Sequence, residues 1–380
     1  MKMIKELENK KVKYLHIMIV NNAKHNNSII KMINNKPDFF NKEDHIFIVA
    51  NEDLYKSIIK DDNVYFDENI IKKIKILKQY ANQCEYVFFH SLNIKYTFLM
   101  SIPKRITNKI IWITWGHDLY RKAPKDIKQK IKEKIYSITK GKVKEHKVKK
   151  FYAIGVGFKY DIIEIKRKFG NNIKILPMLY GYEEGKKIYI DNIIKDKEKK
   201  EIDNNPYKIM IGHCAYQFLR HIEIMDLLKK YKDENLLISL VLSYGDMEYA
   251  RKVEEYAIQT FGNDKVEIIR KLMSPMEYIE YLNTVDICIL DYKHQAALGN
   301  FWRLLYLEKK IFLNKDGILK LFANFEGAET YCVENIKNMN FEQFTKRLND
   351  PQSCKKSVEF YIDENNILNM WKNSINELEN

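Results

Sequence analysis

The sequence has few cysteines and no long apolar run, and both shortages narrow the classes of protein that it can encode. Only five of the 380 residues are cysteine, and no two of them are close in the chain. This pattern fits a reducing compartment and offers no zinc-ligand spacing. No segment approaches the roughly 20 apolar residues of a membrane-spanning helix. Residues 1–12 are charged and lack the apolar core of a signal peptide. We therefore expect a protein that is soluble or attached to a membrane surface.

Familiar catalytic and cofactor motifs are missing as well. The sequence contains no Walker loop, no G-x-G-x-x-G, no H-E-x-x-H and no paired-carboxylate signature. We therefore expect neither a metal nor a cofactor. A metal-independent reaction that releases a diphosphate would need positive side chains and helix N-termini to stabilise the leaving group.

The charge is strongly positive, +14 overall, and it is unevenly spread. Residues 1–200 carry 43 basic and 23 acidic side chains, whereas residues 201–380 carry 22 and 28. The densest run, residues 121–150, holds 13 basic and three acidic residues. Its first basic members are Arg121, Lys122, Lys125 and Lys128. A solvated helix face, a nucleic-acid site and a contact with anionic lipid are the three interpretations of such a run.

Apolar runs alternate with helical patterns in both halves of the chain. The runs that read as strands are residues 14–20, 45–49, 85–89, 109–114, 150–154, 207–211, 236–242, 265–269, 286–290 and 310–313. Strands that alternate with helices form parallel sheets, and nearly continuous apolar strands are covered on both faces. A stretch of charged residues and asparagine separates the two series of strands.

These patterns predict an α/β protein of two doubly wound, Rossmann-like domains that face a cleft. We expect the first domain at residues 1–190, a linker at 191–206 and the second domain at 207–380, with allowance for the last helices to cross back to the first domain. In such sheets ligands bind at the carboxyl ends of the strands. This rule selects the candidate site residues.

In the first domain the candidate site follows the strand at residues 109–114. Asp118 or His117 would act there as general base on a hydroxyl acceptor. The structural alternative is a turn in which Asp118 caps the next helix while Trp112 and Trp115 pack in the core. Two of the chain's four tryptophans at one strand end favour the functional interpretation.

In the second domain three loops carry candidate residues. Gly212, at the end of the first strand, would let the backbone approach a ligand, and Arg220 and His221 would neutralise a phosphate. The second loop offers hydroxyl groups and a tight turn through Ser243, Tyr244 and Gly245. The third precedes a helix whose free N–H groups and dipole attract phosphate. Its residues are Gln295, Leu298, Gly299 and Asn300. Each loop taken alone also suits an ordinary turn or an exposed helix start.

Taken together, four places in the chain resemble glycosyltransferase family 56. They are Trp115-Gly-His-Asp-Leu-Tyr120, Gly212 with Arg220-His221-x-Glu223, Leu242-Ser-Tyr-Gly245 and Gln295-x-x-Leu-Gly-Asn300. They stand in the family's order and span most of the chain. The order of the C-terminal elements also resembles the donor half of GT-B glycosyltransferases, although the Glu-containing loop usual there is absent.

The resemblance implies a metal-independent hexosyltransferase of GT-B fold on the inner face of the plasma membrane. Such an enzyme moves 4-acetamido-4,6-dideoxy-galactose (Fuc4NAc) from a dTDP-sugar to a polyprenyl-diphosphate-linked oligosaccharide. The three C-terminal loops would bind the donor, Asp118 or His117 would be the base, and the basic run at Arg121 would face anionic lipid.

Two departures from the family's pattern keep alternatives open. They are His213-Cys214-Ala215 and Ala296-Ala297, and both affect the sugar and nucleotide that the site would accept. A UDP-sugar donor or another acceptor is therefore an alternative. A nucleic-acid-binding protein that uses the basic half is an alternative from another class.

Overall fold

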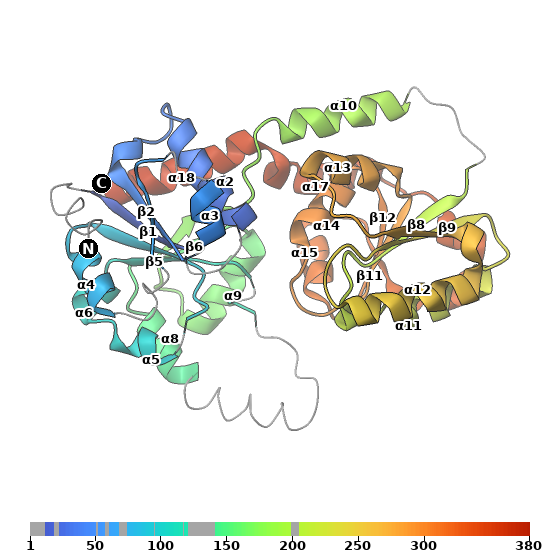
Figure 1. Cartoon of the computed structure of the whole chain (residues 1–380), viewed down its shortest axis with the longest axis horizontal. Coiled ribbons are helices and arrows are strands. Elements are labelled where there is room, and N and C mark those ends of the chain that lie inside the picture. Colours follow the sequence, from blue (N-terminus) through green and yellow to red (C-terminus); the bar gives the residue numbers. More distant parts are fainter. Residues whose placement is uncertain are drawn as a thin grey trace. The chain divides into compact units, whose positions relative to one another are not determined.

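The structure, a computed structural model, describes residues 12–18, 23–50, 52–57, 61–67, 74–94, 96–116, 118–120, 141–198 and 205–380. The chain divides into two compact units. Residues 1–184 and 364–380 form the first, and residues 185–363 form the second. Each unit contains one parallel sheet with helices packed against it (Figure 1).

The first unit has a seven-stranded sheet. Its strands are β1 (Tyr14–Met18), β2 (His45–Val49), β3 (Val64–Phe66), β4 (Tyr86–His90), β5 (Ile110–Ile113), β6 (Ala153–Val156) and β7 (Ile175–Pro177). Their order in the sheet is β3-β2-β1-β4-β5-β6-β7, and neighbouring strands are parallel. The order reverses between β1 and β4, which is the switch point of a doubly wound sheet.

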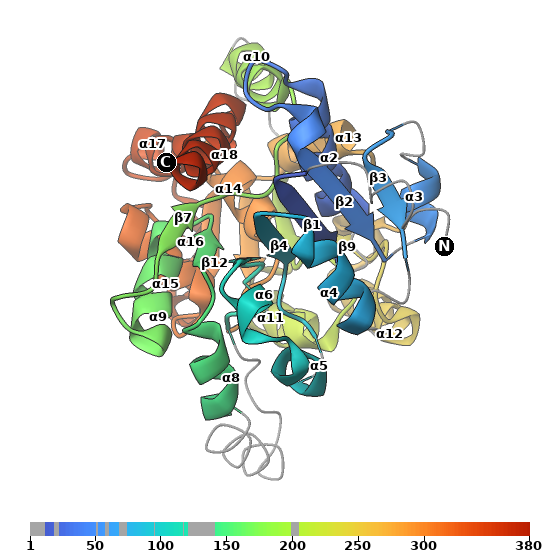
Figure 2. The same ribbon diagram turned by 90° about the vertical axis from the view of Figure 1, so that its left-hand side faces the viewer.

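Helices from both ends of the chain cover this sheet. They are α2 (Ala23–Asn35), α3 (Glu52–Ser57), α4 (Ile74–Asn82), α5 (Tyr96–Ser101), α6 (Lys104–Thr107), α8 (Lys142–Val148), α9 (Lys159–Phe169) and α18 (Glu364–Glu379), with a 3-10 turn at Lys42–Asp44. The C-terminal helix α18 lies beside β7 (Figure 2). The Trp371 indole donates to the Leu179 carbonyl at 2.8 Å, and the Ser374 hydroxyl donates to the Pro177 carbonyl at 2.7 Å.

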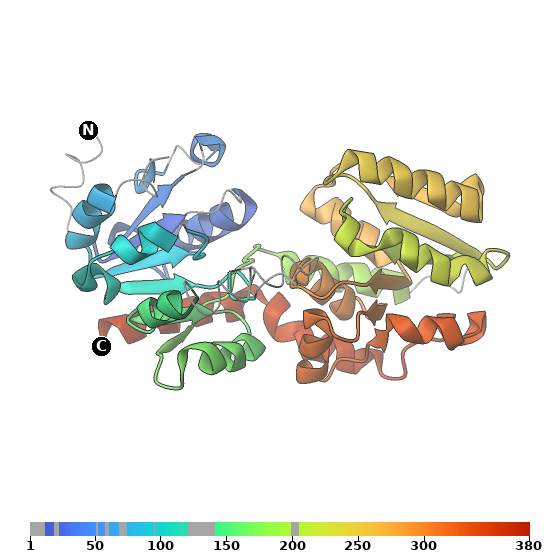
Figure 3. The same ribbon diagram turned by 90° about the horizontal axis from the view of Figure 1, so that it is seen from below.

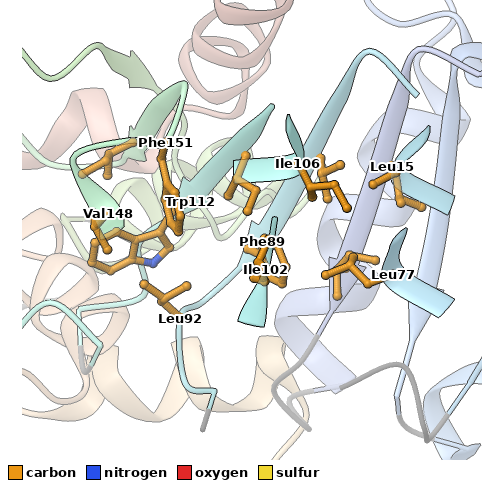
Figure 4. Packing of buried hydrophobic residues seen from close by; sticks show 14 of the residues in the cluster. Leu15, Leu77, Phe89, Leu92, Ile102, Ile106, Trp112, Val148 and Phe151 are labelled. Atoms are coloured by element: carbon orange, nitrogen blue, oxygen red, sulfur yellow. The ribbon is translucent and has the colours of Figure 1, made fainter. Parts of the chain in front are cut away.

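The two faces of this sheet bury different kinds of side chain. Leu15 and Phe89 belong to a largely aliphatic cluster with Leu77 of α4 and Ile106 of α6 (Figure 4). Alternate residues of a strand point to opposite faces. The other face therefore carries the neighbours of these residues, which are aromatic or histidine: Tyr14, His16, Phe47, Phe88 and His90.

The second unit has a six-stranded parallel sheet in the order β10-β9-β8-β11-β12-β13. Its strands are β8 (Tyr207–Ile211), β9 (Leu236–Val241), β10 (Val266–Ile269), β11 (Ile287–Leu290), β12 (Lys310–Leu313) and β13 (Tyr331–Cys332). The switch point lies between β8 and β11, which pair directly.

The helices of the second unit are α10 (Lys186–Glu198), α11 (His221–Leu228), α12 (Met247–Phe261), α13 (Pro275–Thr284), α14 (Leu298–Tyr306), α15 (Ile318–Glu326), α16 (Phe341–Thr345) and α17 (Pro351–Ile362), with 3-10 turns at Gln217–Leu219, Lys229–Tyr231, Asn263–Lys265 and Val333–Asn338. Helices α11 and α12 pack side by side (Figure 3). Local sequence sets several helix ends. Ser274 and Glu277 form a capping box at the start of α13, and Gly262, with φ +88°, ends α12.

The predicted α/β fold with two doubly wound sheets is confirmed. The stretch expected to be a linker differs, because residues 186–198 form helix α10 of the second unit. Charged residues hold this helix in place. Asp191 accepts a hydrogen bond from the Tyr306 hydroxyl at 2.8 Å and forms ion pairs with Lys187 and Lys355. The last helix, α18, belongs to the first unit.

Candidate active site

The loop after β8 begins with a glycine that no other residue can replace without strain. Gly212 has φ +67°, in the region that glycine tolerates best. A Cβ atom there would lie 2.5 Å from Nε2 of His221. The His221 ring therefore packs directly against the backbone at the carboxyl end of β8.

Two helices at the switch point begin with residues in the left-handed conformation. Arg220 (φ 56°, ψ 41°) precedes α11, and Ala297 (φ 49°, ψ 32°) precedes α14. This conformation costs an L-residue about 1–2 kcal/mol and is concentrated at functional sites. Neither residue caps its helix with a side chain, so the first N–H groups of both helices lack side-chain caps. These N-termini carry partial positive charge.

An ion pair joins the loops after β8 and β11. Nη1 of Arg220 lies 2.8 Å from Oδ2 of Asp291, and Nδ2 of Asn314 donates to the other carboxylate oxygen at 2.6 Å. The Asp291 side chain is only 6% exposed, whereas that of Arg220 is 47% exposed. The carboxylate thus fixes the guanidinium group while part of that group stays accessible.

The loop after β9 joins the same group of loops through its backbone. Ala215 donates from its N–H to the Tyr244 carbonyl at 2.8 Å, and Asp246 donates back to the Ala215 carbonyl at 2.7 Å. Gly245 has φ +117°, and a Cβ there would lie 2.5 Å from the Ala215 oxygen. Ser243 is half-buried and Tyr244 is exposed. The structure therefore brings the three predicted loops of the second unit together.

Three buried side-chain atoms in these loops have no hydrogen-bond partner: Nδ1 of His213, Nε2 of His221 and Oε1 of Gln295. Leaving such groups unpaired costs about 1–3 kcal/mol each, which indicates a place for a ligand. Burial lowers the pKa of His213 to about 4 and that of His221 to about 3. Both rings are neutral at pH 7. A neutral His221 offers a ligand a hydrogen bond, and its expected role in neutralising a phosphate stays a prediction.

The glycine loop before α14 differs in detail from the prediction. The helix begins at Leu298, so Gly299 and Asn300 lie in its first turn, and Ala297 takes the left-handed position. Nδ2 of Asn300 donates to the Tyr278 hydroxyl at 3.0 Å, and its Oδ1 accepts from Arg303 at 3.5 Å. The Asn300 side chain is thus held by protein groups. Leu298 is half-buried and Gly299 is exposed.

In the first unit the carboxylate of Asp118 is held by three donors. Oδ2 accepts from the Leu92 N–H at 2.7 Å and from the Trp112 indole at 2.8 Å, and Oδ1 accepts from the Trp115 N–H at 2.9 Å. These bonds use three of about four acceptor positions. Trp112 itself is buried beside Val148 (Figure 4). Trp112 thus packs in the core, as the structural alternative expects, whereas the three donors to Asp118 precede it in the chain and do not belong to a following helix.

The same loop is tied down at its other end. The Tyr120 hydroxyl donates to Oδ1 of Asp161, a buried residue in the first turn of α9, at 2.5 Å. Burial raises the pKa of Asp161 to about 7, the Tyr120 bond opposes that rise, and the charge of Asp118 adds to it. His117 and the predicted basic residues Arg121, Lys122, Lys125 and Lys128 lie outside the described residues.

In the described part of the chain, no cluster of three or more His, Cys, Asp or Glu side chains is arranged to hold a metal ion. Among the helices that the structure describes, none is both long enough and apolar enough to cross a membrane.

Three solved structures share this architecture over nearly their whole length. A glycosyltransferase from Rickettsia africae ESF-5 has a TM-score of 0.64 at 15% identity and covers 97% of this chain and 98% of its own. Anabaena Alr3699/HepE in complex with UDP and glucose has a TM-score of 0.62 at 11% identity, covering 96% and 100%. A UDP-forming α,α-trehalose-phosphate synthase from Burkholderia xenovorans has a TM-score of 0.59 at 8% identity, covering 97% and 100%. The class of fold is therefore GT-B, with two Rossmann-like domains.

Sequence comparison narrows this class to one family. Residues 11–378 match the family described as 4-alpha-L-fucosyltransferase, glycosyl transferase group 56. The chain belongs to this family and is a hexosyltransferase. The resemblance to family 56 that four short motifs carried is thereby confirmed.

Proposed function

We propose that this enzyme moves a deoxy-amino sugar of the Fuc4NAc type from a dTDP-sugar to a polyprenyl-diphosphate-linked oligosaccharide at the inner face of the plasma membrane. In this transfer the bond between the sugar C1 and the terminal phosphate oxygen of the nucleotide breaks. A bond forms between C1 and the acceptor oxygen. The acceptor hydroxyl loses its proton, and the nucleoside diphosphate leaves.

The observation that carries the donor assignment is the group of loops around Arg220. The Arg220–Asp291 ion pair joins the loops that lead into two helices without side-chain caps, α11 and α14, and three unpartnered polar atoms belong to these loops and to the start of α11. Phosphate oxygens would accept from the N–H groups and from Arg220. The same groups would stabilise the negative charge on the leaving diphosphate without a metal.

The loop of residues 114–120, here called the acceptor loop, would face the acceptor hydroxyl. Asp118 and His117 are the candidate bases. The three donors on Asp118 use most of its acceptor positions, which leaves little room for a proton from the acceptor hydroxyl. We therefore assign Asp118 to holding the acceptor loop and His117 to accepting the proton, since an imidazole is suited to this task near pH 7.

Transfer assays on lipid extract test the reaction. Radiolabelled dTDP-sugar and UDP-sugar would be incubated with the enzyme and bacterial membrane lipid, and labelled glycolipid would be extracted. We expect label to pass from the dTDP-sugar. Transfer from the UDP-sugar alone would replace the nucleotide in the proposal. A folded enzyme that transfers from neither donor would contradict the proposed reaction.

Two variants separate the candidate bases. His117→Gln should keep the fold and lose most of kcat, because a positioned base contributes about 10²–10⁴-fold. Asp118→Asn replaces one carboxylate oxygen by a donor, so it should lower stability and activity together. If His117→Gln keeps the wild-type rate and pH profile while Asp118→Asn loses kcat at unchanged stability, Asp118 is the base.

A basic face with exposed apolar side chains supports membrane attachment. Residues 141–170, which include α8 and α9, carry nine basic and three acidic side chains. Among them Val143 is 45% and Ile163 is 50% exposed. On α9 the spacing places Ile163 on the same face as Lys159, Lys166 and Arg167. Basic residues near an anionic surface contribute about 1 kcal/mol each, and apolar side chains add burial.

Vesicle sedimentation tests this face. The protein should bind phosphatidylglycerol vesicles more strongly than phosphatidylcholine vesicles, and Ile163→Asn with Lys166→Glu should weaken that binding. Ile188→Asn on α10, which is 65% exposed in the second unit, is the matched control and should bind as the wild type does. Equal binding to both kinds of vesicle, or salt-sensitive binding to DNA or RNA in their place, would contradict this assignment.

A further inference from the structure

Three buried histidines of the first unit form one hydrogen-bonded file. Nδ1 of His45 lies 2.9 Å from Nε2 of His16, and Nδ1 of His16 lies 2.9 Å from Nε2 of His90. Nδ1 of His90 is in turn hydrogen-bonded to the Tyr180 hydroxyl. His16 and His90 each use both ring nitrogens in these hydrogen bonds, and His45 uses its Nδ1. The nitrogens therefore point at one another and not at a common centre.

The strand register explains why the file crosses the sheet. His45, the first residue of β2, is opposite Tyr14 of β1, and His16 lies two residues further along β1. His90, the last residue of β4, is opposite Met18, again two residues further along. Because side chains alternate with a period of two, all three rings lie on one face, on a diagonal that ends at the carboxyl edge of the sheet.

The surroundings keep all three rings neutral. The His16 ring is stacked between Phe47 and Phe88, with centroids 4.5 and 4.6 Å away, and Trp371 of α18 stacks on His90 at 6.4 Å. Burial lowers the pKa of His45 and of His90 to about 3 and lowers that of His16 as well. Repulsion from His90 and His45 also lowers the pKa of His16. The positive charge of Lys13 lowers the pKa of His45 in the same way.

Because the three rings are neutral, all hydrogen bonds along the file must point in the same direction. A neutral imidazole carries one N–H and one acceptor nitrogen. Three rings in series can therefore donate only all toward Tyr180 or all away from it. Changing the proton position on one ring would break a hydrogen bond unless the other rings changed as well.

The file ends at the acceptor loop. The Tyr180 ring packs edge-on against the Trp115 ring, with the two ring centroids 5.0 Å apart. The backbone N–H of Trp115 donates to the Asp118 carboxylate at 2.9 Å. The orientation of Trp115 thus depends on where the file holds Tyr180.

We propose that His45, His16 and His90 are positioning residues that hold the Tyr180 hydroxyl and so fix the Tyr180 ring, which packs against Trp115 at the start of the acceptor loop. This role rests on the proposed function of that loop. The structural part of the proposal, one neutral file with one direction, does not depend on any activity.

Nitrogen-15 NMR of histidine-labelled protein tests the structural part without substrate. We expect three rings that each have one protonated nitrogen, in the same sense along the file, and that do not titrate between pH 5 and 8. His16→Phe should return the other two rings to mixed tautomers. A file histidine that titrates near pH 6.5, or that shows mixed tautomers in the wild type, would overturn the proposal.

Kinetics with two variants test the positioning role. His16→Phe keeps the aromatic stack and cuts the file in the middle, and Tyr180→Phe removes its end. Each should lower kcat about 10- to 100-fold, the effect of a small misplacement near the reaction, with the donor KM unchanged. The double variant should lose no more than either single variant, because both cut the same file.

Tyr14→Phe is the matched control. Tyr14 lies on the same sheet face, and the variant removes its hydrogen bond to Glu379 but keeps the ring that packs against His45, so kcat should stay at the wild-type value. Should His16→Phe fail to fold, Tyr180→Phe with His45→Gln replaces it in the double-variant test. Additive losses, or a loss in the control equal to that of His16→Phe, would overturn the positioning role. A wild-type enzyme that transfers no sugar contradicts only the proposed function, since the NMR result stands by itself.

Discussion

Two features of Arg220 are unfavourable for the free energy of folding. Its backbone is left-handed, and its partner Asp291 is a carboxylate taken almost entirely out of water. A buried carboxylate needs a cation and hydrogen bonds to be tolerated, and here Arg220 and Asn314 provide them. Because both features lie in the loop that we assign to the diphosphate, Arg220 and Asp291 should matter for donor binding as well as for stability.

The first prediction concerns this ion pair. Arg220→Ala should weaken nucleotide binding by about 10- to 100-fold, the loss of a charged hydrogen-bonding group of about 1.5–3 kcal/mol. Asp291→Asn should weaken it less, because the cation remains but is no longer fixed. Titration calorimetry with dTDP and UDP measures both. Arg270→Ala, which removes an arginine paired with Glu254 in the same unit, is the control and should bind as the wild type does. Equal affinities in all three variants would contradict the assignment of Arg220.

The second prediction concerns Gly212. Gly212→Ala places a Cβ in a left-handed conformation and within 2.5 Å of the His221 ring. Gly327→Ala has the same backbone strain (φ +76°) but nothing within 4 Å of the added carbon. We expect the Gly327 variant to lose about 1 kcal/mol in free energy of unfolding, and the Gly212 variant about 2–4 kcal/mol together with nucleotide affinity. Chemical denaturation measures the difference, and equal losses would show that the His221 contact does not matter.

At the scale of elements, α14 begins at a residue that is ill suited to its conformation. Ala297 is the N-cap of this helix, is left-handed and offers no capping oxygen. Ser274, by contrast, caps α13 with its side chain and completes a capping box. An uncapped N-terminus loses about 1 kcal/mol of helix stability. The exposed positive end that results is what an anionic ligand would use.

The third prediction follows from this contrast. Ala297→Gly should raise the free energy of unfolding by about 0.5–1 kcal/mol, because glycine adopts φ 49° without strain. Ala250→Gly, at the fourth residue of α12, should lower it by about 1 kcal/mol. Thermal denaturation of both variants shows whether each substitution raises or lowers the stability. A loss of stability in Ala297→Gly would mean that the Ala297 side chain contributes packing that outweighs its backbone strain.

The sequence predicted the long elements because their signals are local. Every strand expected from an apolar run overlaps an observed strand. The strands that it missed, β3, β7 and β13, have two or three residues and lie at the edges of the sheets, which is too short for a periodic pattern. Helix α10 was missed because its charged residues resemble those of a linker, and their partners, such as Tyr306, are far away in the chain.

The candidate site was predictable to the level of loops and not of contacts. The rule that ligands bind at the carboxyl ends of strands selected the three loops that meet in the second unit. It gave no role to Asp291, because its pairing with Arg220 depends on the fold. The contact of Arg303 with Asn300 was missed because Arg303 lies within an apolar helical run, FWRLL. His213 was noted only as a departure from the family, and its unpartnered nitrogen is visible only in the structure.

At the scale of the whole molecule, buried titratable groups decide how stability depends on pH. His16, His45 and His90 of the first unit have lowered pKa values in the folded chain and a value near 6.5 when unfolded. Their stabilising effect is therefore complete above pH 6.5 and is lost progressively as the pH falls toward 3. The contribution of Asp161 to the pH dependence of stability has the opposite sign. Its pKa is raised to about 7, so its stabilising effect is complete below pH 3.8 and is lost as the pH rises to 7.

The fourth prediction is the acid stability of the first unit. Between pH 6.5 and 4 each histidine removes up to about 1.4 kcal/mol per pH unit, and Asp161 offsets one of the three. The free energy of unfolding should thus fall by about 1–3 kcal/mol per pH unit. Tryptophan fluorescence in urea measures it, because Trp112, Trp115 and Trp371 report on this unit and only Trp302 on the other. Asp161→Asn removes the offset and should steepen the slope, whereas His16→Phe removes one histidine and should flatten it. A slope near zero in the wild type would mean that the histidine file accepts protons without unfolding, which its complete burial and single direction should prevent.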